Sequence, residues 1–297
     1  MGPVGRREIF REGEEGAERQ RITVEQEDFG TFLRHLEPDY LETLWGNRQG
    51  EVRHAKQGFV TPSYNPVVAT SPDLRALNPA SKEYLEAIFE LGEEGREILQ
   101  ARVGERLGLA PATVSEGVKR LISEGYVTIG PARELELTEH GRTIAEALVR
   151  RHRLAERMLV DILGIPWHLC HEQAEDWEKV MTAEVEEAIL SKLEGEATCP
   201  HGNPIPGAPS SINWSDLKPV ASMEVGETAR LTRLLEDVEL DGDVLKYLED
   251  HNLMPGRDLT LIEVAPDETR TLEVNGERVA LGHALADNLW VLPGRTG

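Results

Sequence analysis

The 297-residue sequence predicts an α+β fold that is mainly α, and three observations carry this prediction. Apolar residues recur at helical intervals across residues 80–193, and short runs of β character follow after residue 217. A segment rich in proline and glycine separates the two regions. A chain of this length forms two or three domains, so we expect helical domains first and a small β-barrel at the C-terminal end.

The charge distribution and the composition indicate which part of the chain could bind nucleic acid and where in the cell the protein is expected. The formal net charge is −22, yet residues 102–157 hold 10 Lys and Arg against 8 Asp and Glu, whereas residues 171–250 hold 6 against 19. The middle of the chain is therefore the part suited to a phosphate backbone. We expect a cytoplasmic protein, because no apolar run reaches the roughly 18 residues of a membrane helix and the N-terminus lacks a signal-peptide core.

Two regions are predicted to lie outside regular domains. Residues 1–79 are expected to form a largely flexible N-terminal extension, with one short helix from about Thr31 to Trp45 and a proline-rich end. Residues 199–216, CPHGNPIPGAPSSINWSD, are a linker by composition. Cys170 and Cys199 are too few for a disulfide framework, and a thiol role stays open for them.

Residues 80–142 are predicted to form a winged helix. Ser81 is a suitable N-cap for the first helix, and ILQARVGERLG predicts the second. PATVSEGVKRLISEG predicts the third, with Pro111 in its first turn and Gly125 at its end. YVTIG and ELELT follow as the strands of a hairpin. This order indicates a winged helix that binds nucleic acid, although a protein-binding module has the same pattern.

In the nucleic-acid interpretation, the helix from Pro111 enters the major groove of double-stranded DNA. The predicted contacts are Thr113, Ser115 and Glu116 to base edges, Lys119 and Arg120 to phosphates, and Arg133 to the backbone or the minor groove. Local roles are the alternative. Ser115 then caps the helix, Glu116 pairs with Arg120, and Lys119 is a solvated charge.

Residues 143–198 are predicted to form a helical dimerisation domain. One long helix spans about Thr143 to Leu163 and ends at Gly164-Ile165-Pro166, and a second runs from about Leu169 to Leu193. The second carries an apolar stripe of Ala174, Trp177, Val180, Met181, Val185 and Ile189 or Leu190. Two such helices cannot bury their apolar faces alone, so we expect them to pack on each other and on a second subunit.

The same two helices carry a pattern of metal-ligand residue types. His152 and Glu156 are four residues apart on the first helix, and one face of the second carries His171, Glu175 and Glu178. Antiparallel pairing of the helices brings His152, Glu156 and His171 together, and such ligands suit divalent Mn, Fe, Co, Ni or Zn. In the alternative, these are solvated ion pairs in which Glu156 contacts Arg153 or Arg157.

Residues 217–297 are predicted to form the small barrel. The strands are ARLTRLL, DLTLIEV, the two arms of TLEVNGERVAL with Asn-Gly at the turn, and LWVL. One helix, VLKYLEDHN, interrupts them and ends before Pro255-Gly256.

From Lys82 to Gly207 the chain resembles the diphtheria toxin repressor family of metal-activated transcription regulators, which has iron- and manganese-responsive members. The similar stretches are KEYLEAIFEL, ARVGERL, TVSEGVKRL, ELELTEHGR, RRHRLAERMLVDILGI, EDWEKVMTAEVEEAI and GNPIPG. VLKYLEDHNLMPG resembles the SH3-like (FeoA-like) domain of larger members. The resemblance implies a homodimeric repressor that binds operator DNA and is not an enzyme.

The resemblance also implies two metal sites in each subunit. The ancillary site falls on His152, Glu156 and His171, with Asp241 of the SH3-like domain as a further ligand. Asp241 is equally suited to capping the helix that follows it. The primary site, which ties the first helix of the winged domain to the dimerisation helix, falls on Glu83, Glu86, Glu175 and Glu178.

Two departures from the family bear on the metal. Iron-responsive members have Met and Cys where this chain has Glu83 and Glu175, and manganese-responsive members have carboxylates, so Mn(II) is favoured over Fe(II). Lys179 stands where the family has a histidine ligand. An ammonium group repels a cation, so we expect this site to be weakened, rebuilt or lost. Ion pairs of Lys179 with the nearby glutamates would mimic the metal-closed state.

The sequence therefore predicts a metal-dependent winged-helix repressor of metal-ion homeostasis genes, activated by Mn(II) or Fe(II). A winged-helix regulator with weakened or lost metal dependence is the alternative, and Lys179 supports it. An enzyme built on the carboxylate–histidine site is a further class, but the sequence offers no acid or base beyond the ligands.

Overall fold

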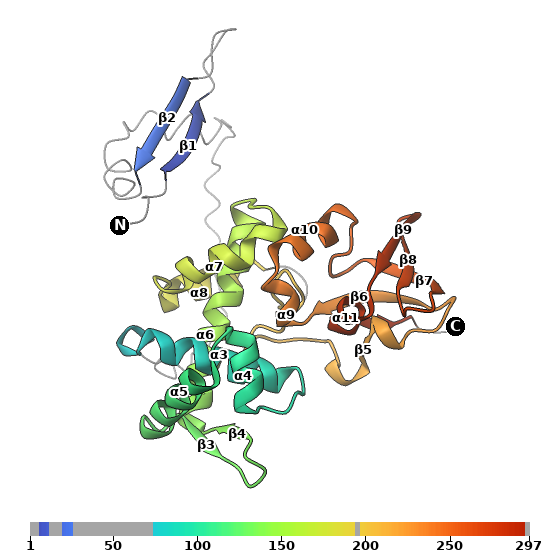
Figure 1. The fold of residues 1–297 in the computed structure, drawn as a ribbon. Helices are drawn as coiled ribbons and strands as arrows, with labels where there is room; N and C mark the ends of the chain where they lie inside the picture. Colours follow the sequence, from blue (N-terminus) through green and yellow to red (C-terminus); the bar gives the residue numbers. More distant parts are fainter. Residues whose placement is uncertain (1–5, 12–19, 26–73, 194–196, 295–297) are drawn as a thin grey trace, which may run out of the picture. The chain divides into compact units, whose positions relative to one another are not determined.

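The computed structural model describes residues 6–11, 20–25, 74–193 and 197–294 of the chain (Figure 1). The chain divides into two compact units, residues 1–66 and residues 67–297. In the first unit, strand β1 (Arg6–Arg11) pairs antiparallel with β2 (Gln20–Glu25). The predicted helix from Thr31 to Trp45 and most of the predicted N-terminal extension lie outside the described residues.

The second unit begins with the winged helix. Helix α3 (Pro79–Glu93) is followed by α4 (Gln100–Leu107) and α5 (Pro111–Ser123), and then by the hairpin of β3 (Val127–Ile129) and β4 (Leu135–Leu137). Apolar side chains from all three helices form one core, including Leu85, Ile88, Val103, Val114, Val118 and Leu121. The α4–α5 pair is the predicted helix-turn-helix.

The predicted start of the first helix is wrong. Asn78 is the N-cap, since its side chain accepts a hydrogen bond from the Ala80 N–H and Pro79 occupies the first helical position. Ser81 lies within the helix and is fully buried, and its hydroxyl donates to the Glu124 carboxylate at 3.0 Å. Pro79 fits because the first helical position has no intrahelical partner for an N–H.

The dimerisation helices differ from the prediction at three points. Helix α6 (Glu139–Arg157) begins earlier, because Thr138 caps it by accepting from the Gly141 N–H, and it continues into a π-turn, η3 (Met158–Ile162). The predicted second helix is broken into α7 (Cys170–Glu178) and α8 (Ala183–Leu190), preceded by the turn η4 (Trp167–Leu169). Thr182 adopts an extended N-cap conformation, which its short polar side chain favours over the helix interior.

This break divides the predicted apolar stripe. Ala174, Met181 and Ile189 are buried in a core with Leu154 and Leu159 of the preceding helix and turn. The remaining apolar side chains are exposed in the single protomer, by 44% for Trp177, 65% for Val180 and 41% for Val185. An exposed apolar face on these helices is what the packing of a second subunit requires.

The C-terminal region forms a six-stranded antiparallel sheet in the order β5-β10-β6-β7-β8-β9. The strands are β5 (Lys218–Pro219), β6 (Thr228–Leu234), β7 (Asp258–Val264), β8 (Arg270–Val274), β9 (Glu277–Leu281) and β10 (Leu289–Pro293). Asn275 and Gly276 both have positive φ, as the predicted Asn-Gly turn requires. The helices of this region are α9 (Glu236–Glu239), α10 (Gly242–Asp250) and α11 (His283–Asn288), and its short turns are η5 (Trp214–Asp216) and η6 (Val220–Ser222). A further short turn, η2 (Leu74–Ala76), precedes α3. The predicted fold class is confirmed.

The junction of the hairpin and α6 gives a stability prediction. A Cβ atom at Gly141 would lie 1.9 Å from the Tyr126 carbonyl oxygen, so the strand end and the helix start must separate. We expect Gly141→Ala to lower the free energy of unfolding by about 1–3 kcal/mol in denaturant titrations. Gly242→Ala is the matched control, because nothing lies within 4 Å of its Cβ position. Equal unfolding midpoints for the two variants would contradict this account.

Candidate metal centre

The predicted ligand trio comes together between α6 and α7. His152 and Glu156 lie one turn apart on α6, and His171 is the second residue of α7. His171 Nδ1 lies 3.0 Å from Glu156 Oε1 and 3.1 Å from His152 Nε2. The predicted alternative for Glu156 is wrong, since Arg153 pairs with Glu93 and Arg157 with Asp161.

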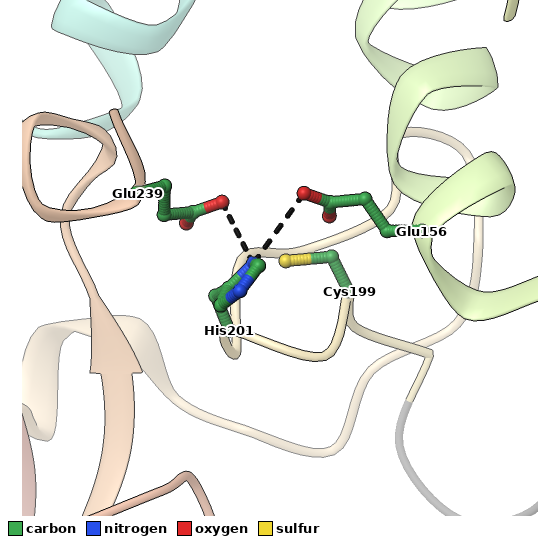
Figure 2. A group of neighbouring side chains, drawn as sticks. All are labelled: Glu156, Cys199, His201 and Glu239. Carbon is green, nitrogen blue, oxygen red and sulfur yellow. Dashed lines mark ion pairs between the residues drawn. The ribbon is translucent and has the colours of Figure 1, made fainter. Parts of the chain in front are cut away.

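The predicted linker supplies two further potential ligands, Cys199 and His201. His201 is fully buried, and its Nδ1 lies 2.9 Å from Glu239 Oε2 and 3.4 Å from Glu156 Oε1 (Figure 2). The loop is held by a backbone hydrogen bond from Cys199 N to Asn203 O at 2.7 Å. Gly202 is required there, because its φ is +92° and a Cβ would lie 2.0 Å from the Thr232 carbonyl.

Helix α9 of the SH3-like domain contributes Glu236 and Glu239. Both are buried, and Glu239 Oε2 lies 3.4 Å from His171 Nδ1, with Glu236 Oε1 at 4.0 Å. The sequence pointed instead to Asp241. Its carboxylate accepts from the N–H groups of Asp243 and Val244 and thus caps α10, and no described ligand group includes it.

The spacing of these atoms matches a coordination sphere. Ligand atoms bound at ~2.1 Å to one ion lie ~3.0–3.4 Å from each other in octahedral or tetrahedral geometry. The contacts of Glu156 with His171 and His201, and those of Glu239 with the same two histidines, all fall between 2.9 and 3.4 Å. The ligand atoms of the groups that share Glu156 and Glu239 therefore lie at separations compatible with one small divalent cation, as well as with direct hydrogen bonds. We refer to His152, Glu156, His171, Cys199, His201, Glu236 and Glu239 as the buried cluster.

Hydrogen bonds and charges within the buried cluster shift the pKa values of its histidine and glutamate side chains. Burial alone would lower the pKa of His171, but its hydrogen bonds to Glu156 and Glu239 raise it to about 10. Burial would raise the pKa of Glu239, but the positive charge of His201 lowers it to about 2. Desolvation, followed by the charges of Glu239 and Glu90, raises the pKa of Glu236. Protonated imidazoles thus balance the carboxylates, and a cation bound here would have to displace these protons.

The predicted primary site lines a neighbouring cavity of about 320 Å³, whose wall includes Glu83, Glu86, Glu90, His152, Glu175, Glu178 and Lys179. His152 joins this cavity to the buried cluster, since its Nδ1 lies 2.8 Å from Glu178 Oε2. Burial, followed by the charges of Glu178 and Glu90, raises the pKa of Glu86. Among the described residues, Glu86 Oε1 has no hydrogen-bond partner although it is buried.

Lys179 lies at the rim of this cavity and not among its glutamates. Its side chain is 56% exposed, and its Nζ donates to Asp176 Oδ1 at 3.2 Å. The predicted ion pairs with Glu83, Glu86, Glu175 or Glu178 are replaced by this local pair, because Lys179 is the C-cap of α7 and turns outward with the chain.

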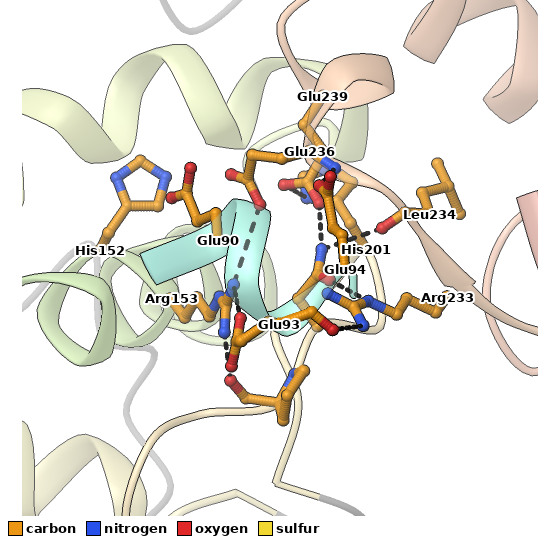
Figure 3. A network of polar contacts seen from close by, with 12 residues as sticks. Glu90, Glu93, Glu94, His152, Arg153, His201, Arg233, Leu234, Glu236 and Glu239 are labelled. Atoms are coloured by element: carbon orange, nitrogen blue, oxygen red, sulfur yellow. Dashed lines mark hydrogen bonds and ion pairs between the residues drawn. The ribbon is translucent and has the colours of Figure 1, made fainter. Parts of the chain in front are cut away.

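Two buried arginines, Arg153 and Arg233, lie beside the buried cluster (Figure 3). Arg153 is 2% exposed and donates to Glu93 Oε2 of α3 at 2.7 Å, with Glu236 Oε2 at 3.8 Å. Arg233 of β6 donates to Asn203 Oδ1 and to the Glu93 carbonyl at 3.4 Å. These contacts hold the winged helix, the linker and the SH3-like domain around the buried cluster.

The predicted DNA contacts are distributed over α5 and the hairpin. Thr113, Glu116 and Lys119 are exposed, and Ser115 is half-buried. Arg133 is exposed at the hairpin turn with a φ of 70°. Arg120 turns partly inward, since its Nε donates to Ser81 Oγ at 3.3 Å. In the part of the chain that the structure describes, no helix is long and apolar enough to cross a membrane.

Sequence reasoning missed four members of the buried cluster: Cys199, His201, Glu236 and Glu239. The spacing of Cys199 and His201, two residues apart in CPH, was the available signal. Glu236 and Glu239 gave none, because acidic residues are common in this region of the sequence. Only the fold brings a short helix of the SH3-like domain against α6.

Three family models match the chain. Residues 76–135 match "Iron dependent repressor, N-terminal DNA binding domain", residues 138–207 match "Iron dependent repressor, metal binding and dimerisation domain", and residues 218–293 match "FeoA domain". These matches cover the winged helix, the α6–α8 region with the linker start, and the six-stranded sheet.

Curated relatives and solved structures agree with these models. The iron-dependent repressor IdeR of Mycobacterium tuberculosis is 36% identical over 223 residues, covering 72% of this chain and 96% of that protein. The diphtheria toxin repressor of Corynebacterium diphtheriae is 34% identical over 223 residues, covering 73% and 98%.

Among solved structures, a manganese-dependent transcriptional repressor in complex with manganese has a TM-score of 0.63 at 28% identity, covering 72% of this chain and all of that one. IdeR of T. acidophilum has a TM-score of 0.60 at 27% identity, covering 74% of this chain and all of that one. With its matched domains, its fold and its near-complete coverage of these relatives, the chain belongs to the iron- and manganese-dependent transcriptional repressor family that includes the diphtheria toxin repressor.

Proposed function

We propose that this protein is a homodimeric repressor that binds operator DNA of metal-ion homeostasis genes in the cytoplasm when it holds a divalent metal. One observation carries the proposal. In the buried cluster, ligand atoms of Glu156, Cys199, His201 and Glu239 all lie within 4.8 Å of one another, and these residues come from the dimerisation helices, the linker and the SH3-like domain. An ion held by the buried cluster would be coordinated by the dimerisation helices, the linker and the SH3-like domain at the same time.

The proposed regions of the chain have distinct tasks. Residues 80–142 bind DNA, with Thr113, Ser115 and Glu116 at base edges and Lys119, Arg120 and Arg133 at the backbone. Residues 143–198 bind metal and form the dimer through the exposed face of Trp177, Val180 and Val185. Residues 199–216 form the linker, residues 217–297 form the SH3-like domain, and residues 1–79 are an N-terminal extension.

The proposed activating metal is Mn²⁺ or Fe²⁺. Carboxylate and imidazole groups dominate both the buried cluster and the neighbouring cavity, and this donor set favours Mn²⁺. Cys199 adds a softer sulfur donor that suits Fe²⁺ equally well. Burial raises the pKa of the Cys199 thiol, so the thiolate forms there only when a cation is bound.

The proposed mechanism is thermodynamic linkage. A cation binds more tightly to the arrangement in which α6, α7, the linker and α9 converge, and this shifts the population towards the form that binds DNA. The protein side chains hold the ion, and the arginine contacts with Glu93 pass its effect to α3.

DNA binding with and without metal tests the proposal. A duplex is first enriched from random-sequence DNA by the wild-type protein with Mn²⁺. Its affinity is then measured with Mn²⁺, with Fe²⁺ without oxygen, and with a chelator. We expect affinity to fall by about tenfold or more with the chelator, as the coupling energies of allosteric proteins indicate. Equal affinity in all three conditions would favour a winged-helix regulator without metal dependence, for which Lys179 is the supporting residue.

A further inference from the structure

Helix α9 faces two ways. Glu236 and Glu239 belong to the buried cluster, whereas Asp237, which follows Glu236, contacts the winged helix. Asp237 Oδ2 lies 2.6 Å from Arg96 Nη1, and its Oδ1 lies 2.6 Å from Arg106 Nε. One carboxylate thus accepts charge-assisted hydrogen bonds from two arginines of another domain.

The two arginines occupy key positions in the winged helix. Arg96 lies in the turn between α3 and α4, and its Nη2 also donates to Asn288 Oδ1 of the SH3-like domain at 2.7 Å. Arg106 lies in the last turn of α4, the first helix of the helix-turn-helix, and its side chain is only 3% exposed. Its guanidinium is fixed by Glu94 at 2.9 Å and Glu90 at 3.4 Å, so Asp237 meets a preorganised partner.

A backbone contact strengthens the same junction. The Glu236 N–H, at the start of α9, donates to Glu94 Oε1 at 3.1 Å, and the Glu94 side chain is 1% exposed. Because α9 is a single turn of four residues, Asp237 cannot keep its position if Glu236 and Glu239 shift. Cation binding by the two glutamates therefore also fixes the carboxylate that contacts α4.

We propose that Asp237 is the positioning residue through which the SH3-like domain passes the metal state of the buried cluster to the helix-turn-helix. This inference rests on the proposed function, and it adds a route that the metal ligands alone do not provide. Without a cation, Glu236 and Glu239 are held only by the ion pairs and hydrogen bonds of the buried cluster, so α9 and the contact of Asp237 with α4 are held less tightly.

Asp237→Asn tests this route, because it keeps the shape of the side chain and removes its charge. The matched control is Asp258→Asn. Asp258 also pairs with an arginine, Arg230, at 2.8 Å, but both lie on the barrel surface and within one domain. Retained unfolding midpoints would show that both variants are folded.

Amide hydrogen exchange gives a readout that does not depend on DNA. In the wild type, Mn²⁺ is expected to slow exchange in both α4 and α9 relative to chelator. In Asp237→Asn, it is expected to slow exchange in α9 alone, and Asp258→Asn should behave as the wild type. An undiminished response of α4 in Asp237→Asn would overturn the proposal.

DNA affinity gives the second readout, with the duplex enriched by the wild-type protein. Asp237→Asn should lose about fivefold or more of the metal-dependent gain in DNA affinity, while Mn²⁺ affinity without DNA changes by less than about twofold. Arg96→Gln should reproduce the loss, and the double variant should add little to it. If the wild type itself gains no DNA affinity from metal, the proposed function fails, whereas the exchange experiment still decides the role of Asp237.

Discussion

Glu156→Gln is expected to abolish high-affinity metal binding by the buried cluster. Glu156 Oε1 lies within 3.4 Å of ring nitrogens of His152, His171 and His201, and its Oε2 is buried without a hydrogen-bond partner among the described residues. An amide oxygen is a neutral and weaker ligand, and it carries no charge to balance the cation or to accept from the protonated imidazoles. We expect metal affinity to fall by on the order of a hundredfold or more, since even outer partners of metal ligands cost about 10- to 100-fold.

Mn²⁺ and Fe²⁺ titrations followed by calorimetry, with elemental analysis of the loaded protein, measure this loss. Glu187→Gln is the control, because Glu187 is an exposed residue of the neighbouring helix α8. A second variant, Cys199→Ser, changes one donor and keeps its size, so it separates loss of metal from loss of fold. Full metal content in Glu156→Gln would mean that the buried cluster is an ion-pair network and not a metal site.

Lys179→His is expected to create a stronger metal response at the cavity beside α3. The change removes a positive charge from the rim of a cavity that is lined by Glu83, Glu86, Glu175 and Glu178, and it supplies an imidazole at the position where the family resemblance implies a histidine ligand. Both effects favour a divalent cation, and we expect its affinity at this cavity to rise by about tenfold or more.

The measurement is the number of Mn²⁺ ions bound per protomer and the metal concentration needed for DNA binding. Lys192→His is the control, because Lys192 is an exposed lysine beyond the end of α8. If Lys179→His binds the same number of ions with the same affinity as the wild type, Lys179 does not limit this cavity. The glutamates would then serve the structure of α3 and α7 and not a cation.

Local patterns in the sequence determined most of the fold. Helical periodicity, with Pro111 at the first position of α5 and Gly125 just beyond its end, placed the helix-turn-helix. Asn275-Gly276 placed the hairpin of the SH3-like domain, because these signals act within a few residues of the chain. The break after α7 escaped prediction, since the apolar stripe continues across it. The exposed members of the stripe belong to a face that the described parts of the same protomer leave largely uncovered.

The residues of the buried cluster likewise divide into those that the sequence predicted and those that only the fold revealed. His152, Glu156 and His171 were predictable because helix spacing and one short turn bring them together. Cys199, His201, Glu236 and Glu239 come from regions distant in sequence, and only tertiary packing sets their distances. The sequence alone therefore determined most of the elements, the family and three of the seven members of the buried cluster. The tertiary structure decided which acidic residue of the SH3-like domain faces that cluster, because Asp241 satisfies the start of α10 whereas α9 turns Glu236 and Glu239 inward.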